Sequence, residues 1–177
     1  MKRGFGFFAA LMLGLMVSLS SSSAYAQDEG RQPLEISEGK IGTEKKLGIG
    51  LGGGFVSGLS LKYFLSPSTA LQVGIGGGAN GTLGLSVDYL IHPFVLTEGS
   101  GVTIPLYFGG GIGLGRYAYL NNGTNGGGIN LHVPLGVAFE LEKFPLDIFL
   151  QAEPGFGVSN NGTFFFWGGT SGIRLYF

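Results

Sequence analysis

The stretch Thr170-Ser171-Gly172-Ile173-Arg174-Leu175-Tyr176-Phe177 decides the fold of this chain. Its apolar residues Ile173, Leu175 and Phe177 stand at every second position. Successive side chains of a β-strand point to opposite faces, so this spacing predicts a strand with one apolar face. The opposite face carries the charged residue Arg174.

The same alternation recurs along the chain and predicts eight strands. The clearest case is 129–141, where apolar residues occupy every odd position from Ile129 to Leu141. The expected strands are 47–52, 59–65, 71–76, 83–91, 102–109, 129–141, 146–153 and 170–177. An even number of antiparallel strands suits an up-and-down barrel, so an all-β, eight-stranded antiparallel barrel is expected.

Composition indicates that this barrel is transmembrane. Hydrophobic residues make up 44% of the chain and charged residues 12%, and the mean hydropathy is +0.34. No apolar run beyond the first 26 residues is long enough for a membrane helix, which needs about 20 residues. The 36 glycines also disfavour helices. The net charge of −1 gives no electrostatic reason to expect a nucleic-acid partner.

The first 46 residues have the pattern of an exported protein. Lys2 and Arg3 precede an apolar run at 5–19, and Ala24-Tyr25-Ala26 follows it. This order predicts a signal peptide over 1–26, cleaved after Ala26. The polar segment 27–46 is expected to be a flexible periplasmic leader before the barrel at 47–177. The chain has no Cys, so it cannot form disulfides.

The connections between the expected strands alternate between the two sides of the barrel. Three of the four outer connections contain Asn-Gly-Thr, at 80–82, 122–124 and 161–163. Asn-Gly is a strong hairpin signal, so short outer loops are expected. Pro134 and Pro154 fall inside expected strands, where β-bulges are predicted because proline removes a ladder hydrogen bond.

The polar positions of the alternation are expected to face the barrel interior. This inward set comprises Ser60, Lys62, Gln72, Ser86, Asp88, Thr103, Tyr107, Asn130, His132, Glu140, Asp147, Gln151, Glu153, Thr170 and Arg174. An eight-stranded barrel is narrow enough for side chains to fill it, so a plugged polar interior is expected. Buried charges must be paired. We therefore predict a salt-bridge cluster formed by Glu140, Asp147 and Arg174, joined by Lys62.

Two apparent motifs carry little chemistry. Residues 48–53 match Gly-x-Gly-x-x-Gly, but a dinucleotide site requires a following helix, and glycines here continue into a strand. His92 and His132 lie apart in sequence without neighbouring ligands, so no metal site is predicted. A catalytic group of His132, Ser86 and Glu153 would require the fold to bring them together.

Residues 47–177 resemble the small OmpA/OmpX-type eight-stranded outer-membrane barrels, in particular members without an assigned activity. The similarity rests on Val133-Pro134-Leu135-Gly136, on 145–150 and on 172–177.

In that family a polar-x-Gly-x-x-apolar-x-apolar ending is read by the barrel-assembly machinery. Thr170, Gly172, Leu175 and Phe177 fill this pattern, and Ile173 lies on the same apolar face. The resemblance implies that these residues form an assembly signal.

The expected function is that of an integral outer-membrane protein with a structural or surface-interaction role, without enzymatic activity or a cofactor. The expected partners are outer-membrane lipid, the export and barrel-assembly machinery and periplasmic chaperones. The alternatives are a narrow porin-like channel or a transporter of small hydrophobic molecules, and, further off, a lipid-A-modifying enzyme. A soluble periplasmic β-sandwich is a separate alternative for the fold.

Overall fold

The computed structural model describes residues 46–77, 83–97, 101–117, 126–141, 143–160 and 162–177. The chain divides into two units, 1–33 and 34–177, and every described residue belongs to the second. The predicted signal peptide and nearly all of the predicted leader lie outside the described residues. The described strands are β1 (Leu47–Gly54), β2 (Ser57–Ser66), β3 (Thr69–Gly77), β4 (Leu83–Thr97), β5 (Val102–Tyr117), β6 (Gly126–His132), β7 (Leu135–Leu141), β8 (Leu146–Ser159) and β9 (Gly162–Tyr176).

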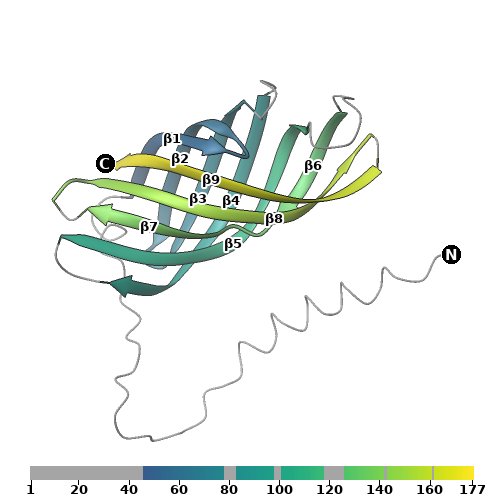
Figure 1. The fold of residues 1–177 in the computed structure, drawn as a ribbon. Coiled ribbons are helices and arrows are strands. Elements are labelled where there is room, and N and C mark those ends of the chain that lie inside the picture. The colour runs from purple at the N-terminus through teal and green to yellow at the C-terminus, as the bar shows by residue number, and fades with distance from the viewer. Residues whose placement is uncertain (1–45, 78–82, 98–100, 118–125, 142, 161) are drawn as a thin grey trace, which may run out of the picture. The chain divides into compact units, whose positions relative to one another are not determined.

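These strands form one antiparallel sheet that closes on itself. β1 pairs with β2 and with β9, so the first strand lies beside the last, as Figure 1 shows in blue and yellow. β6 and β7 are two consecutive segments that together make one strand of the ring, because both pair with β5 on one side and β8 on the other. The described part of the chain is therefore a ring of eight antiparallel strands, which confirms the predicted strand number and direction.

The register fixes how strongly the strands tilt. Directly paired residues lead from Arg174 through Gly50 around the ring to Gly157 and then to Phe164. The path returns to β9 displaced by ten residues, 174 minus 164. With a rise of about 3.3 Å per residue and strands about 4.8 Å apart, this displacement tilts each strand by about 40°.

The prediction of β-bulges at Pro134 and Pro154 is wrong. His132 pairs with Gly111 and Leu135 with Phe108, so β5 keeps one register across Pro134. Pro154 pairs with Trp167 inside an unbroken β8–β9 register. Each proline carbonyl still accepts a backbone hydrogen bond, Pro134 from Gly109 and Pro154 from Val133, both at 2.9 Å. The strands therefore lose single bonds at these prolines and keep their register.

Register shifts occur elsewhere, and several strands are longer than predicted. In β4–β5 the register shifts between Ile91 and Phe94, around Pro93, and again between Val95 and Thr97. β4 therefore continues through a segment that we expected to be a connection. β5 runs on to Tyr117 through glycines, and β9 begins at Gly162. The predicted turns at 80–82 and 122–124 lie outside the described residues, whereas Gly162, in the third, has a φ of +114°.

The two faces of the ring differ sharply in chemistry. The inward face buries polar and charged side chains, which are Ser60, Lys62, Gln72, Asp88, His92, Thr103, Asn130, His132, Glu140, Asp147, Gln151, Glu153 and Arg174. The outward face is apolar, with Leu51, Leu131 and Trp167 at 65%, 65% and 72% exposure. Among the described residues no helix is long and apolar enough to cross a membrane.

Candidate functional site

The ring interior has two ends, which we name by residues at its rims. The Phe177 end contains the β2–β3, β4–β5 and β7–β8 connections, and the Asn160 end contains the β1–β2 and β8–β9 turns. Phe177 is held to β1 by its backbone, since its amide donates to the carbonyl of Leu47 at 2.9 Å. The apolar residues of the predicted assembly signal, Ile173, Leu175 and Phe177, are exposed on the outward face.

A buried ion pair lies toward the Phe177 end. Arg174 Nε donates to Asp147 Oδ1 at 3.1 Å, and both side chains are fully buried. The two residues are direct partners across β8 and β9. Tyr176 donates its hydroxyl to Asp147 Oδ2 at 2.6 Å. The Arg174 guanidinium also lies 3.9 Å from the centre of the Phe149 ring, so an aromatic face covers the charge.

The other two residues of the predicted cluster lie at the same end without a direct bond. Glu140 is the cross-strand partner of Asp147. Lys62 is fully buried, and its Nζ lies 4.7 Å and 5.2 Å from the ring centres of Phe64 and Tyr107. Within the described part of the chain, Lys62 Nζ and Glu140 Oε2 have no hydrogen-bond partner. The structure thus joins Arg174 to Asp147 and leaves Lys62 and Glu140 as opposite charges without a hydrogen bond between them.

A second charged group lies toward the Asn160 end. His132 Nε2 is 2.7 Å from Asp88 Oδ1, and His132 Nδ1 is 2.8 Å from Asn130 Oδ1. Because a carboxylate can only accept, Nε2 is the donor to Asp88. All three side chains are at most 3% exposed. Each of these residues was predicted to face inward, but the group that they form was not predicted.

Glycine makes the contact between Asp88 and His132 possible. The two residues lie on β4 and β6, and Gly111 of β5 stands between them as the direct partner of both. A Cβ at Gly111 would collide with Asp88 Oδ1 and His132 Nε2, and a Cβ at Gly113 would collide with the Asn130 amide. Because the alternating glycines of β5 have no side chains, the side chains of β4 and β6 can contact each other across β5.

The group of His132, Ser86 and Glu153 that enzymatic chemistry would require does not form. Among the described residues, the hydrogen-bond partners of His132 are Asn130 and Asp88. Both ring nitrogens are thus engaged, and neither is free to accept a proton from a serine hydroxyl. The described residues also contain no cluster of three His, Cys, Asp or Glu side chains that could hold a metal ion.

Two glutamines connect the two ends. Gln72 Nε2 lies 3.1 Å from Asp88 Oδ2 and 3.2 Å from Gln151 Oε1, and Gln72 Oε1 accepts from Arg174 Nη1 at 2.7 Å. Gln151 also accepts from the Tyr107 hydroxyl at 3.0 Å and donates to Glu153. The interior therefore holds one continuous hydrogen-bonded network, whose glutamines carried no signal in the sequence beyond their inward parity.

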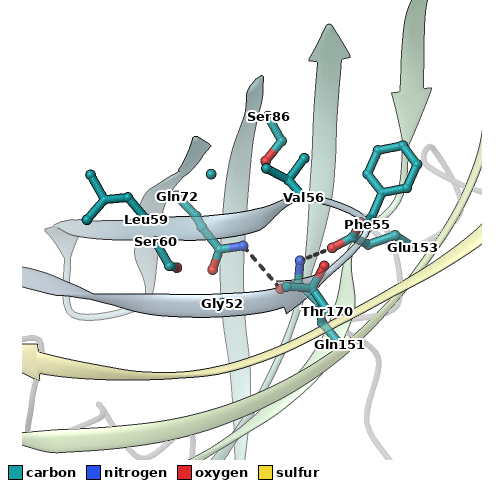
Figure 2. Close-up of a pocket in the computed structure, with 11 residues that line it drawn as sticks. Gly52, Phe55, Val56, Leu59, Ser60, Gln72, Ser86, Gln151, Glu153 and Thr170 are labelled. Atoms are coloured by element: carbon teal, nitrogen blue, oxygen red, sulfur yellow. Dashed lines mark hydrogen bonds between the residues drawn. The ribbon is translucent and has the colours of Figure 1, made fainter. Parts of the chain in front are cut away.

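A small cavity adjoins this network. Its volume is about 20 Å³, and Figure 2 shows Gln72, Gln151 and Glu153 joined by hydrogen bonds at its wall. Phe55 and Val56, from the β1–β2 turn, line it beside the inward residues. Phe55 stacks on Phe166 with ring centres 4.9 Å apart. In comparisons with known proteins, no family model, curated protein or solved structure matches this chain.

Proposed function

We propose that this protein is an integral outer-membrane β-barrel with a structural or surface-interaction role and a plugged polar interior. The observation that carries the proposal is the inverted distribution of side chains. Charged and polar residues fill the inside of the ring, and large apolar residues cover the outside. A soluble ring of this size would bury its apolar face inside and expose its polar face to water.

The outward apolar surface extends around the ring. Each strand of the ring carries exposed large apolar side chains. Examples are Leu51 on β1, Leu83 on β4 and Leu150 on β8, which are 65%, 78% and 59% exposed. Soluble monomers rarely expose apolar patches of more than a few hundred Å². A lipid hydrocarbon region is the solvent in which such a surface is stable.

The strand lengths support the same proposal. A tilted transmembrane strand needs about 9–11 residues to cross the hydrocarbon layer. β4, β5, β8 and β9 contain 15, 16, 14 and 15 residues, and β2 and β3 contain 10 and 9. The closed pairing also leaves few backbone groups to be satisfied by solvent, which a lipid environment requires.

The filled interior favours a structural or surface-interaction role over conduction. Water and ions need a continuous path, whereas the network from Asn130 through Gln72 to Tyr176 crosses the interior. Outer-membrane insertion also implies export, for which the predicted signal peptide at 1–26 is the candidate route, and assembly by the barrel-assembly machinery. Cell fractionation tests export and assembly into the outer membrane, and the mass of the purified chain tests cleavage of the signal peptide.

The single tryptophan provides a direct test of membrane insertion. Trp167 is the one Trp of the chain, and its side chain points outward with 72% exposure. In vesicles, its emission should shift to the blue and should be quenched by lipids brominated along their acyl chains. A water-soluble chain whose Trp167 emission is quenched by aqueous iodide and not by brominated lipid would contradict the proposal.

A further inference from the structure

The cavity beside the network has a mixed lining of polar and apolar residues. Its polar lining consists of Ser60, Gln72, Ser86, Gln151, Glu153 and Thr170. These side chains line one space together with Phe55 and Val56 of the β1–β2 turn, and Figure 2 shows them as sticks. Glycines keep the space open, since a Cβ at Gly74 would lie 2.7 Å from Ser86 Oγ. A volume of about 20 Å³ holds one particle of the size of a water molecule.

Among the described residues, two carboxylates of the interior form no ion pair with a basic side chain. Of the four buried acidic residues described inside the ring, Asp88 pairs with His132 and Asp147 pairs with Arg174. Glu140 forms no ion pair, but it lies at the Phe177 end with the fully buried cation of Lys62, whose Nζ has no hydrogen-bond partner within the described residues.

Glu153 is the other described carboxylate without an ion pair. It is 4% exposed, and its hydrogen-bond partners, Gln151 and Thr170, are neutral. The basic side chain that acts on it electrostatically, His132, is itself hydrogen-bonded to Asp88. A buried carboxylate without a counter-charge costs several kcal/mol. A positive charge bound next to Glu153 would remove that cost.

From this juxtaposition we infer that the cavity binds one small monovalent cation of the size of sodium. The Glu153 carboxylate is the charged ligand, and the hydroxyl groups of Ser60, Ser86 and Thr170 are neutral ligands. Hard cations prefer such oxygen donors. One positive charge neutralises Glu153, whereas a divalent ion would leave a buried positive charge and an anion would add to the negative one.

Access to the site lies at the β1–β2 turn. β1 ends at Gly54, while β9 continues for eight residues beyond Thr170, the β9 partner of Gly54, to Gly162. At the Asn160 end, β1 therefore stops well short of its neighbour β9. Phe55 and Val56 of this turn line the cavity and are half-buried. We expect displacement of these two side chains to open a path for an ion at this turn.

Thermal unfolding of the purified, refolded chain in detergent tests the inference. Sodium chloride is exchanged for choline chloride at constant ionic strength, and the midpoint is followed against sodium concentration. Ligand binding to the folded state raises the midpoint in a saturable way, here by roughly 2–5 °C. Glu153→Gln should abolish this sodium dependence. Glu140→Gln removes a buried carboxylate at the Phe177 end, lowers the baseline midpoint and should retain the sodium dependence.

A second variant covers the case in which Glu153→Gln does not fold. Thr170→Val removes one hydroxyl ligand, and we expect the sodium concentration at half-saturation to rise severalfold. Sodium-23 NMR of the unsubstituted chain should show line broadening from bound sodium that excess lithium or potassium reduces. Equal midpoints in sodium and choline, or a sodium dependence that persists in Glu153→Gln, would mean that the cavity holds water alone and would overturn the inference. These outcomes are independent of whether Trp167 lies in lipid.

Discussion

At the Phe177 end of the interior, the buried ion pair joins neighbouring strands, whereas at the Asn160 end it crosses an intervening strand. Asp147 and Arg174 face each other across β8 and β9. Asp88 and His132 belong to β4 and β6, with Gly111 of β5 between them. The first pair needs two residues in register. The second also needs the absence of a third side chain.

The two ends also differ in what covers their charges. Aromatic rings cover the cations at the Phe177 end, with Phe149 against Arg174 and Phe64 and Tyr107 against Lys62. At the Asn160 end the amide groups of Asn130 and Gln72 contact the His132–Asp88 pair, and a cavity adjoins the same network. Both side chains of the Arg174–Asp147 pair at the Phe177 end are fully buried. We expect substitutions there to have the larger effect on stability.

The largest effect is expected for Arg174→Ala. The substitution leaves Asp147 buried without its cation and removes the bond to Gln72 that joins the two ends. Removing one partner of a buried ion pair costs about 3–5 kcal/mol. The free energy of unfolding, measured by urea titration of the refolded chain in vesicles, should fall by this amount.

Lys143→Ala is the matched control for Arg174→Ala, because Lys143 is an exposed cation in the β7–β8 connection at the same end. Its effect should stay within about 0.5 kcal/mol. Equal unfolding midpoints for Arg174→Ala and the unsubstituted chain would show that the ion pair does not hold the Phe177 end together.

Gly111→Ala should have the next largest effect, at the other end. The added methyl group meets both Asp88 Oδ1 and His132 Nε2. Overpacking of this kind costs about 1–3 kcal/mol. Gly110→Ala is the control on the same strand, because a Cβ there meets nothing within 4 Å. If both substitutions change the unfolding free energy equally, then the contact between β4 and β6 does not depend on the absence of a side chain at Gly111.

A double-mutant cycle sharpens the same point. In a His132→Ala background the imidazole is absent, so the methyl group that Gly111→Ala adds gains room. The cost of Gly111→Ala should then fall, giving a coupling energy of about 1 kcal/mol between positions 111 and 132. The four unfolding free energies of the cycle provide the measurement. Strict additivity would mean that the two side chains do not share this space.

Alternation in the sequence was sufficient to predict the ring, because each strand has a polar and an apolar face. Residues 129–141 show this most clearly, and the prediction placed Glu140 inward, as the structure does. The lengths of β5 and β9 were underestimated. Glycine-rich segments such as 109–115 carry few side chains, so their alternation could not be recognised.

The interior contacts were predictable where they depend on neighbouring strands. Arg174 and Asp147 follow from hairpin geometry, because both strands are consecutive in the chain. Asp88 and His132 are separated by 44 residues, and their contact depends on the absence of a side chain at Gly111. The cavity depends on Phe55 and Val56 folding into the ring, which no periodic pattern encodes.

The smallest effect is expected for Pro154→Ala, a substitution between the two ends. The pairing of Val133 with Pro154 supplies one backbone bond, from the Val133 amide to the Pro154 carbonyl at 2.9 Å. An alanine amide at position 154 can return a second bond to the Val133 carbonyl, worth about 0.5–1.5 kcal/mol. Loss of proline also makes the unfolded chain more flexible, which costs about 0.4–1 kcal/mol. The two contributions nearly cancel, so the unfolding free energy should change by less than about 1 kcal/mol.

Hydrogen exchange distinguishes two opposing contributions from a substitution without any effect on hydrogen bonding. If the new bond forms, the amide at position 154 should be as protected from exchange as that of Val133. A rapidly exchanging amide would mean that the β6–β8 register is interrupted at this proline, as the sequence had led us to expect.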